Sequence, residues 1–272
     1  MDSQHLQNPS AQLTRALARV LGAGGVAALA TVVEAPRAVG AKLLLESGGA
    51  RTGTTGDAAL DAALAGHARA FLATRAEART LPVEEFAPAL ETWRGARVLF
   101  ERVEPEPRVV VCGAGHVGAA LARLAHAVGY CVTLLDDRED FLTRARFPEP
   151  NIELVAAPGW ARAITEAVGT GRGVYVAVVT RGHNEDEDCM RAVLAVRPDY
   201  VGMIGSRRRT SIVLARLRES GFDEGLLKEV RAPVGLDIGA VSPEEVALSI
   251  LAEIVARRRG GTGAPLSAWR RQ

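Results

Sequence analysis

Short apolar runs in the second half of the chain alternate with segments whose apolar residues recur at helical spacing. The apolar runs cover residues 109–112, 131–135, 152–155, 173–180 and 200–204. The helical segments cover residues 117–128, 161–168 and 185–196, with one more ending at residue 220 and a last one over 243–259. Continuous apolar runs are typical of parallel strands that are buried on both faces, and strands that alternate with helices form doubly wound sheets. The pattern therefore predicts an α/β domain with a doubly wound parallel sheet.

The last of these helices has the clearest start. Ser242 is expected at the N-cap, Pro243 at the first helical position, and Glu245 completes a capping box.

The first part of the chain has fewer elements. Strands are predicted over residues 26–33, 41–46 and 97–103, and helices over 13–21 and 57–72. This combination predicts a smaller α+β domain. Prolines at positions 105 and 107 then block both helix and central strand, which predicts an extended linker. The expected organisation is a domain over residues 1–103, a linker over 104–108, and a larger domain over 109–272.

Composition narrows the class of protein without indicating a charged partner. The 272 residues are 48% hydrophobic and carry a formal net charge of +1, as expected for a globular protein with a full core. A charge so close to zero gives no electrostatic reason to expect nucleic acid or an anionic membrane as a partner. Residues 1–10 are polar, and no apolar run is long enough to span a bilayer. We therefore expect a cytoplasmic protein that meets membranes only through its partners.

The cysteines are Cys112, Cys131 and Cys189, which are far apart in the sequence and lie in or beside apolar segments. Their spacing is not that of a zinc site, and no metal site is expected. We predict that all of them are reduced residues that pack in the core.

The clearest candidate for a binding site follows the first apolar run of the larger domain. Residues 109–112 lead into Gly113-Ala114-Gly115-His116-Val117-Gly118, a Gly-x-Gly-x-x-Gly turn that opens a helix. In such turns the first glycine makes the tight turn, the second lets a pyrophosphate approach the backbone, and the third lets helix and sheet pack closely. Asp136 and Asp137 end the next apolar run about 20 residues later, where a ribose hydroxyl would need an acceptor. These features predict a Rossmann-like domain with a nucleotide-type site.

Two further loops, over residues 180–184 and 205–208, follow later apolar runs and are expected at the same edge of the sheet. Ligands of doubly wound sheets bind at this edge, beyond the carboxyl ends of the strands. Backbone N–H groups at helix N-termini, together with guanidinium groups, suit an anionic, phosphorylated ligand. The candidate ligand-binding residues of the three loops and of the acidic pair are Gly113, Ala114, Gly115, His116, Val117, Gly118, Asp136, Asp137, Arg138, Thr180, Arg181, His183, Gly205, Ser206, Arg207 and Arg208.

Several of these residues also have purely structural interpretations. Arg207 and Arg208 could belong to a solvated helix start, although positive charge is unfavourable there unless an anion is bound. His183 could cap the following helix, Asp136 could cap a turn, and Asp137 could form a surface ion pair with its neighbour. Neither a nucleophile–base pair nor a Ser/His/Asp arrangement is visible in the sequence, so no catalytic residue is named.

Taken in order, the motifs of the second domain resemble those of a known family. The matching segments are Gly113-Ala114-Gly115-His116-Val117-Gly118, Asp136-Asp137-Arg138 with Phe141, Arg146-Phe147-Pro148, Thr180-Arg181-Gly182-His183, Tyr200 to Arg208, Pro233 to Ala240, and Ser242 to Ala247. They are similar to the xanthine dehydrogenase accessory family (XdhC/CoxI-like), and the likeness covers the whole second domain.

The resemblance implies a maturation factor for molybdenum hydroxylases such as xanthine dehydrogenase or carbon monoxide dehydrogenase. Members of this family bind the molybdenum cofactor (molybdopterin), assist its sulfuration and deliver it to the apo-enzyme. The partners expected on this basis are an apo-molybdenum hydroxylase, a cysteine desulfurase, and a second copy of the chain in a homodimer.

Two other hypotheses remain open at this point. In the first, the chain is an oxidoreductase whose Gly113 turn holds FAD or, as a weaker candidate, NAD(P), with Asp136 on a ribose, and it reduces a metal or sulfur centre during maturation. In the second, the chain is a scaffold with a vestigial Rossmann fold, which predicts no bound small molecule. A yellow colour of the purified protein would favour the flavin.

The first domain is similar to the family only in part. Pro36-Arg37 and Gly40-Ala41-Lys42 match a Gly-Ser-x-Pro-Arg…Gly-x-Lys segment of the family, but Glu34-Ala35 replaces Gly-Ser. The family's Gly-Thr-Ile-Gly-Gly-Gly turn stands here as Gly53-Thr54-Thr55-Gly56-Asp57-Ala58. Two glycines that would let a ligand approach the backbone are replaced, which argues against a cofactor role for this turn. The departure favours a specialised branch, such as one that serves carbon monoxide dehydrogenase.

Overall fold

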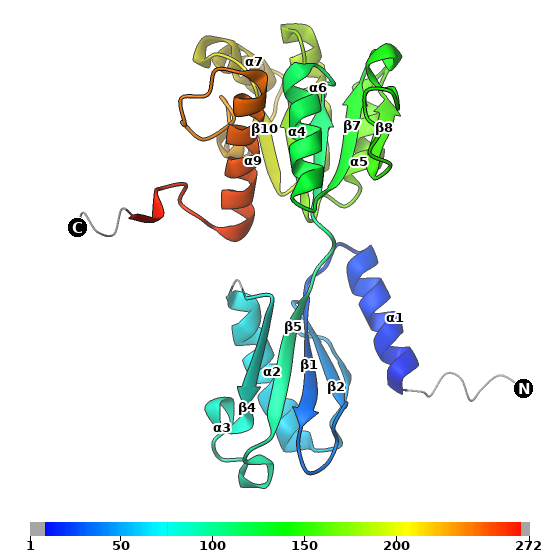
Figure 1. Ribbon diagram of the computed structural model, residues 1–272, viewed down its shortest axis with the longest axis vertical. Coiled ribbons are helices and arrows are strands. Elements are labelled where there is room, and N and C mark those ends of the chain that lie inside the picture. The colour runs from blue at the N-terminus through cyan, green and yellow to red at the C-terminus, as the bar shows by residue number, and fades with distance from the viewer. Residues whose placement is uncertain (1–8, 75, 268–272) are drawn as a thin grey trace, which may run out of the picture. The chain divides into compact units, whose positions relative to one another are not determined.

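The computed structural model describes residues 9–74 and 76–267, without the side chains of Pro9, His183 and Asn184. The chain forms two compact units, Met1–Pro105 and Glu106–Gln272 (Figure 1). Each unit has its own sheet and its own hydrophobic core. None of the helices in the described ranges is long and apolar enough to cross a membrane.

The first unit is built on an antiparallel sheet with the strand order β3-β2-β1-β5-β4. Its strands are β1 (Ala27–Glu34), β2 (Lys42–Glu46), β3 (Arg51–Gly53), β4 (Ala78–Pro82) and β5 (Arg97–Val103). Successive side chains of β1 face opposite sides of the sheet. Ala28, Ala30 and Val32 therefore pack with helix α2 (Ala58–Ala73), whereas Ala27 packs with helix α1 (Pro9–Gly22). The predicted α+β domain thus has a helix on each face of its sheet.

The hydrophobic pattern fails to predict β3, β4 and the short helix α3 (Val83–Phe86) of this unit. β3 and β4 are the two edge strands of the sheet. β3 has no buried residue, and β4 buries only Leu81. An edge strand that faces mostly solvent has no apolar run for a sequence pattern to detect.

The second unit has a parallel sheet with the order β10-β9-β6-β7-β8, which confirms the predicted doubly wound, Rossmann-like fold. Its strands are β6 (Arg108–Cys112), β7 (Cys131–Asp136), β8 (Ile152–Ala156), β9 (Val174–Val178) and β10 (Tyr200–Met203). Its helices are α4 (His116–Ala127), α5 (Trp160–Val168), α6 (His183–Val196), α7 (Arg207–Glu219), α8 (Glu224–Glu229) and α9 (Pro243–Arg259). Helices α4 and α9 cover one face, and α5, α6 and α7 cover the other (Figure 1).

The strand order places the switch point of the sheet at β6. The chain proceeds from β6 to β7 and β8 on one side, and then crosses to β9 and β10 on the other. The carboxyl ends of β9, β6 and β7 therefore lie next to one another, with β6 in the middle. Ligands of open α/β sheets bind at this position.

Several elements begin or end a few residues from the predicted positions. β9 ends at Val178, so that Thr180 already lies in a loop, and α6 begins at His183 rather than at residue 185. α8 was not predicted; the segment after it runs beside β10 and joins it in a bridge between Gly202 and Arg231. The predicted capping box at Ser242 is confirmed.

Candidate functional site

The glycine turn connects β6 to α4 at the switch point. Gly113 has a φ of +117°, and a Cβ on it would lie 2.6 Å from the carbonyl oxygen of Val179. A Cβ on Gly118 would lie 1.8 Å from the carbonyl oxygen of Gly113. The backbone itself therefore requires a glycine at these two positions. Gly115 is different, because its φ is −66° and no atom lies within 4 Å of the place where its Cβ would be.

The space at Gly115 adjoins unsatisfied hydrogen-bond donors. Gly115 is the N-cap of α4, and no side chain caps the first turn of this helix. The N–H groups of a first helical turn have no partner within the helix, and the helix dipole adds positive potential there. Open space and free donors at the same place suit a phosphate or another anion.

Asp136, at the end of β7, holds the glycine turn in place. It is only 1% exposed, and its Oδ2 accepts a hydrogen bond from Ala114 N at 2.6 Å. Arg138 donates from Nε to Oδ1 at 2.8 Å and from Nη2 to Oδ2 at 3.0 Å. Burial alone would raise the pKa of Asp136, but the hydrogen bonds from Arg138 and Ala114 outweigh burial, and the pKa is lowered. A ribose hydroxyl could bind Asp136 only by displacing one of these donors.

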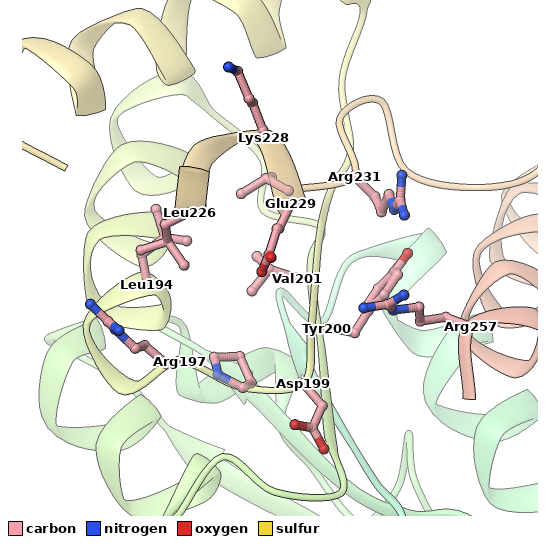
Figure 2. Close-up of a pocket in the computed structure, with 12 residues that line it drawn as sticks. Leu194, Arg197, Asp199, Tyr200, Val201, Leu226, Lys228, Glu229, Arg231 and Arg257 are labelled. Carbon is pink, nitrogen blue, oxygen red and sulfur yellow. The ribbon is translucent and has the colours of Figure 1, made fainter. Parts of the chain in front are cut away.

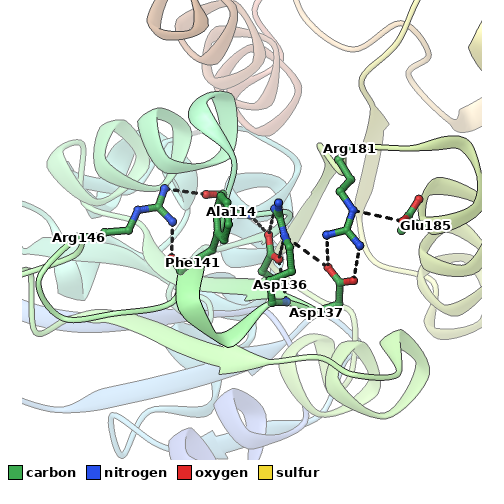
Figure 3. A network of polar contacts seen from close by, with 8 residues as sticks. Ala114, Asp136, Asp137, Phe141, Arg146, Arg181 and Glu185 are labelled. Atoms are coloured by element: carbon green, nitrogen blue, oxygen red, sulfur yellow. Dashed lines mark hydrogen bonds and ion pairs between the residues drawn. The ribbon is translucent and has the colours of Figure 1, made fainter.

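The segment after β7 is attached to the same turn by arginine and aromatic contacts (Figure 3). Arg146 donates hydrogen bonds to the carbonyl oxygens of Ala114, at 3.1 Å, and Phe141, at 2.7 Å. The guanidinium carbons of Arg138 and Arg146 lie 3.6 Å and 4.7 Å from the centre of the Phe141 ring. These cation–π contacts and hydrogen bonds fix the segment against the turn.

Arg181 and Asp137 form an ion pair at the same edge of the sheet. Arg181 Nη2 lies 2.9 Å from Asp137 Oδ2, and Nη1 lies 3.4 Å from Oδ1. Arg181 Nε is also 3.3 Å from Glu185 Oε1. The predicted pairing of Asp137 with its neighbour is present but longer, since Arg138 Nε lies 3.9 Å from Asp137 Oδ1. Together with Asp136, which pairs with Arg138, these side chains form a single charged network (Figure 3).

A buried carboxylate joins the predicted loop after β9, which contains Thr180, to the predicted loop after β10, which contains Ser206. Asp186 on α6 is fully buried, accepts a hydrogen bond from the Thr180 hydroxyl, and accepts another from Arg209 Nε at 2.7 Å. Ser206 caps α7 by accepting a hydrogen bond from Arg209 N at 3.2 Å. The hydroxyl groups of Thr180 and Ser206 are thus engaged in the fold, where they position the loops.

Other predicted site residues face solvent. His116, Arg207 and Arg208 are exposed. The guanidinium groups of Arg207 and Arg208 have no hydrogen-bond or ion-pair partner among the residues that the structure describes, and the first turn of α7 contains no acid. Their charge at the positive end of a helix is therefore not neutralised locally. The side chain of His183 lies outside the described part of the structure, and its role stays a prediction.

The cysteines pack largely as expected. Cys112 and Cys189 are fully buried, whereas Cys131 is partly exposed and its thiol donates to Glu106 Oε2 at 3.2 Å. Burial, aided by the neighbouring Cys112 thiol, raises the pKa of Cys189 well above its ordinary range. Burial and Glu106 likewise raise the pKa of Cys131. Within residues 9–74 and 76–267, no group of three or more His, Cys, Asp or Glu side chains could hold a metal ion.

A separate pocket of about 270 Å³ lies at the amino end of β10 (Figure 2). Tyr200, the first residue of β10, lines it and donates a hydrogen bond to Glu253 at 3.1 Å. The charged residues of its wall are Arg197, Asp199, Lys228, Glu229, Arg231 and Arg257. The predicted loops follow the last residues of the strands, so this pocket is not part of the predicted site.

The divergent turn of the first unit is occupied by its own side chains. Asp57 caps α2 by accepting hydrogen bonds from Ala59 N and Leu60 N, at 3.0 and 3.1 Å, and it also accepts one from Trp93 Nε1 at 2.9 Å. The Trp93 hydrogen bond, followed by that of Leu60, lowers the pKa of Asp57. A carboxylate therefore fills the helix N-terminus at which an anionic ligand would bind.

Two residues with clear structural roles at the site, Asp186 and Arg146, are not among the predicted ligand-binding residues. Asp186 lies on the same apolar face of α6 as Cys189, Met190 and Val193, all of which are fully buried. An acidic residue at the spacing of an apolar helix face indicates a buried carboxylate, and this pattern was detectable in the sequence. Arg146 belongs to a segment that supports the family resemblance. Its contact with Ala114 joins residues 32 positions apart, so the sequence around either residue does not indicate it.

A parallel sheet with a glycine turn at its switch point places this unit in the Rossmann-like class of folds. Comparison with known families identifies the class further. The profile of the XdhC Rossmann domain matches residues 109–254, and that of the XdhC and CoxI family matches residues 20–84. The chain belongs to the XdhC and CoxI family, as the resemblance implied.

Relatives with assigned names match more than half of the chain. One is a Bacillus subtilis protein named as a probable component of xanthine dehydrogenase, which is 30% identical over 162 residues, covering 60% of this chain and 46% of that protein. Another is the molybdenum cofactor insertion chaperone PaoD of Escherichia coli. It is 26% identical over 165 residues, which cover 58% of this chain and 50% of PaoD. The chain thus spans half or less of the length of these two relatives.

A solved structure supports the fold as a whole. It is a Bacillus halodurans protein described as a xanthine dehydrogenase, and it superposes with a TM-score of 0.64 at 20% sequence identity. The matched region covers 95% of this chain and 70% of the Bacillus halodurans chain. At this identity the likeness concerns the fold.

Proposed function

We propose that the chain is a maturation factor for a molybdenum hydroxylase and that it binds the molybdenum cofactor through the anionic end of the pterin. Its membership of the XdhC and CoxI family and its similarity to a molybdenum cofactor insertion chaperone support this proposal. The observation that carries it is the open space at Gly115, next to the uncapped N-terminus of α4 at the switch point. The loops that follow β6, β9 and β10 would hold the anionic group, and Arg207 and Arg208 would add positive charge.

We further propose that any sulfur transfer is carried out by a partner such as a cysteine desulfurase. A sulfur-accepting cysteine must be a thiolate that a donor can reach. Cys112 and Cys189 are fully buried, and the raised pKa values of Cys189 and Cys131 favour the protonated thiol. The chain would therefore carry and deliver the cofactor, and its apo-hydroxylase client would receive it.

The alternative oxidoreductase function receives less support from the geometry. A dinucleotide such as FAD or NAD(P) normally relies on an acid after the second strand of the fold to bind a ribose. Asp136 is buried and engaged by Ala114 and Arg138, and Asp137 is engaged by Arg181. Asp136 is therefore not available without a rearrangement, and Asp137 becomes available only when its exposed pair with Arg181 opens.

A binding experiment tests the proposal. Purified protein is incubated anaerobically with molybdenum cofactor released from a molybdoenzyme and is separated by gel filtration, and the bound pterin is measured by fluorescence after oxidation. Parallel samples contain FAD or NADPH. We expect pterin to co-elute with the protein, and a Gly115→Asp variant to lose it. Tight binding of FAD with no binding of pterin would replace this proposal with the oxidoreductase.

A further inference from the structure

The Arg181–Asp137 ion pair crosses the end of the strand that carries the glycine turn. Arg181 follows β9 and Asp137 follows β7, while β6 lies between these two strands. The pair joins residues 44 positions apart, with contacts of 2.9 and 3.4 Å between the guanidinium and carboxylate groups. It therefore crosses the carboxyl end of β6.

Two ion pairs at this edge differ in how easily a ligand could separate them. The Arg138–Asp136 pair is enclosed, since the Asp136 side chain is 2% exposed and also holds Ala114 N. In the Arg181–Asp137 pair the side chains are 45% and 28% exposed. Exposed ion pairs are weak. Thr180, the residue before Arg181, lies against the glycine turn, since a Cβ on Gly113 would be 3.1 Å from Thr180 Cα.

We propose that Arg181 is the guanidinium that binds the anionic group of the ligand, and that Asp137 is a built-in competitor that determines which anions can bind. In the free protein Asp137 holds the two Nη atoms of Arg181, while Glu185 lies 3.3 Å from its Nε. An anion at the glycine turn must take the Nη atoms from Asp137. A phosphate or diphosphate with two or more negative charges competes successfully with a single carboxylate, because it offers Arg181 more charge in the same bidentate arrangement. Ligands with one charge or none are rejected. This inference rests on the anion site proposed above and identifies its selecting residue.

The test measures binding of inorganic pyrophosphate and of acetate to four forms of the full-length protein by isothermal titration calorimetry. Asp137→Asn keeps the shape of the side chain and removes its charge. We expect it to bind pyrophosphate roughly tenfold more tightly than the wild type and to begin to bind acetate. Arg181→Gln should bind pyrophosphate at least tenfold more weakly. Asp140→Asn is the matched control: it makes the same change in net charge at an exposed acid three positions along the chain.

Ionic strength separates competition from a structural effect. The gain in Asp137→Asn should shrink between low and high salt, because the competing interaction is between exposed charges and is screened. Thermal unfolding of each variant verifies that the fold is retained. Equal affinities in Asp137→Asn, Asp140→Asn and the wild type would overturn the competitor role and leave the anion site intact. No pyrophosphate binding in any form, wild type included, would remove the anion site and both proposals with it.

Discussion

Replacing Gly115 by Asp separates ligand binding from folding at the glycine turn. A Cβ at this position meets no atom within 4 Å, and its φ of −66° is open to every residue. Asp is also among the best N-cap residues, so that Gly115→Asp should leave the stability unchanged or raise it by a few tenths of a kcal/mol. The new carboxylate would accept hydrogen bonds from the first-turn N–H groups that we assign to the ligand.

The cost to binding can be estimated from the charges alone. Two unit negative charges about 4 Å apart repel by about 1 kcal/mol in a water-like medium and by about 4 kcal/mol at the effective dielectric constant of a protein surface. We therefore expect pyrophosphate to bind Gly115→Asp roughly five to a thousand times more weakly than the wild type. Gly115→Ser, which adds a neutral cap of similar length, should lose much less.

Calorimetric titration with pyrophosphate, paired with thermal unfolding of the same samples, checks both expectations. Wild-type affinity in a folded Gly115→Asp protein would refute the placement of the anion at this turn. A large fall in Tm would refute the conclusion that Gly115 is free of packing constraints.

Three further predictions concern stability. Gly118→Ala should lower the Tm far more than Gly115→Ala, as calorimetry would show, because a Cβ on Gly118 would lie 1.8 Å from the Gly113 carbonyl oxygen. Ser242→Ala, which removes the α9 capping box, should cost about 1 kcal/mol of unfolding free energy in urea titrations and leave pyrophosphate binding unchanged. The pKa of Asp136 is lowered by folding, so its contribution to stability is complete above its unfolded pKa of about 4 and is lost as the pH falls toward the folded value. Urea midpoints measured from pH 6 down to pH 2.5 should fall less steeply for Asp136→Asn than for the wild type; parallel curves would contradict this.

The elements that the sequence predicts best are those that depend on local chemistry. β9 is a five-residue strand buried at every position, and its apolar run was visible without the structure. The capping box of α9 is formed by residues within one helical turn. By contrast, β3 and β4 lie at sheet edges, where pairing is made by backbone groups and leaves little trace in the side chains.

The sequence by itself determined the class of the larger domain and the position of its glycine turn, because both follow from short-range periodicity and from the backbone freedom of glycine. Only the tertiary structure decided what the charged residues do. The sequence left Asp136 as a candidate for a ribose or for a turn cap; in the structure it contacts Ala114 N, 22 positions away in the sequence. Asp137 forms an ion pair with Arg181, which is 44 positions away. Such pairs depend on the order of strands in the sheet, which brings β7 and β9 to either side of β6. A charge in the sequence has many potential partners, and the strand order determines which of them lies within reach.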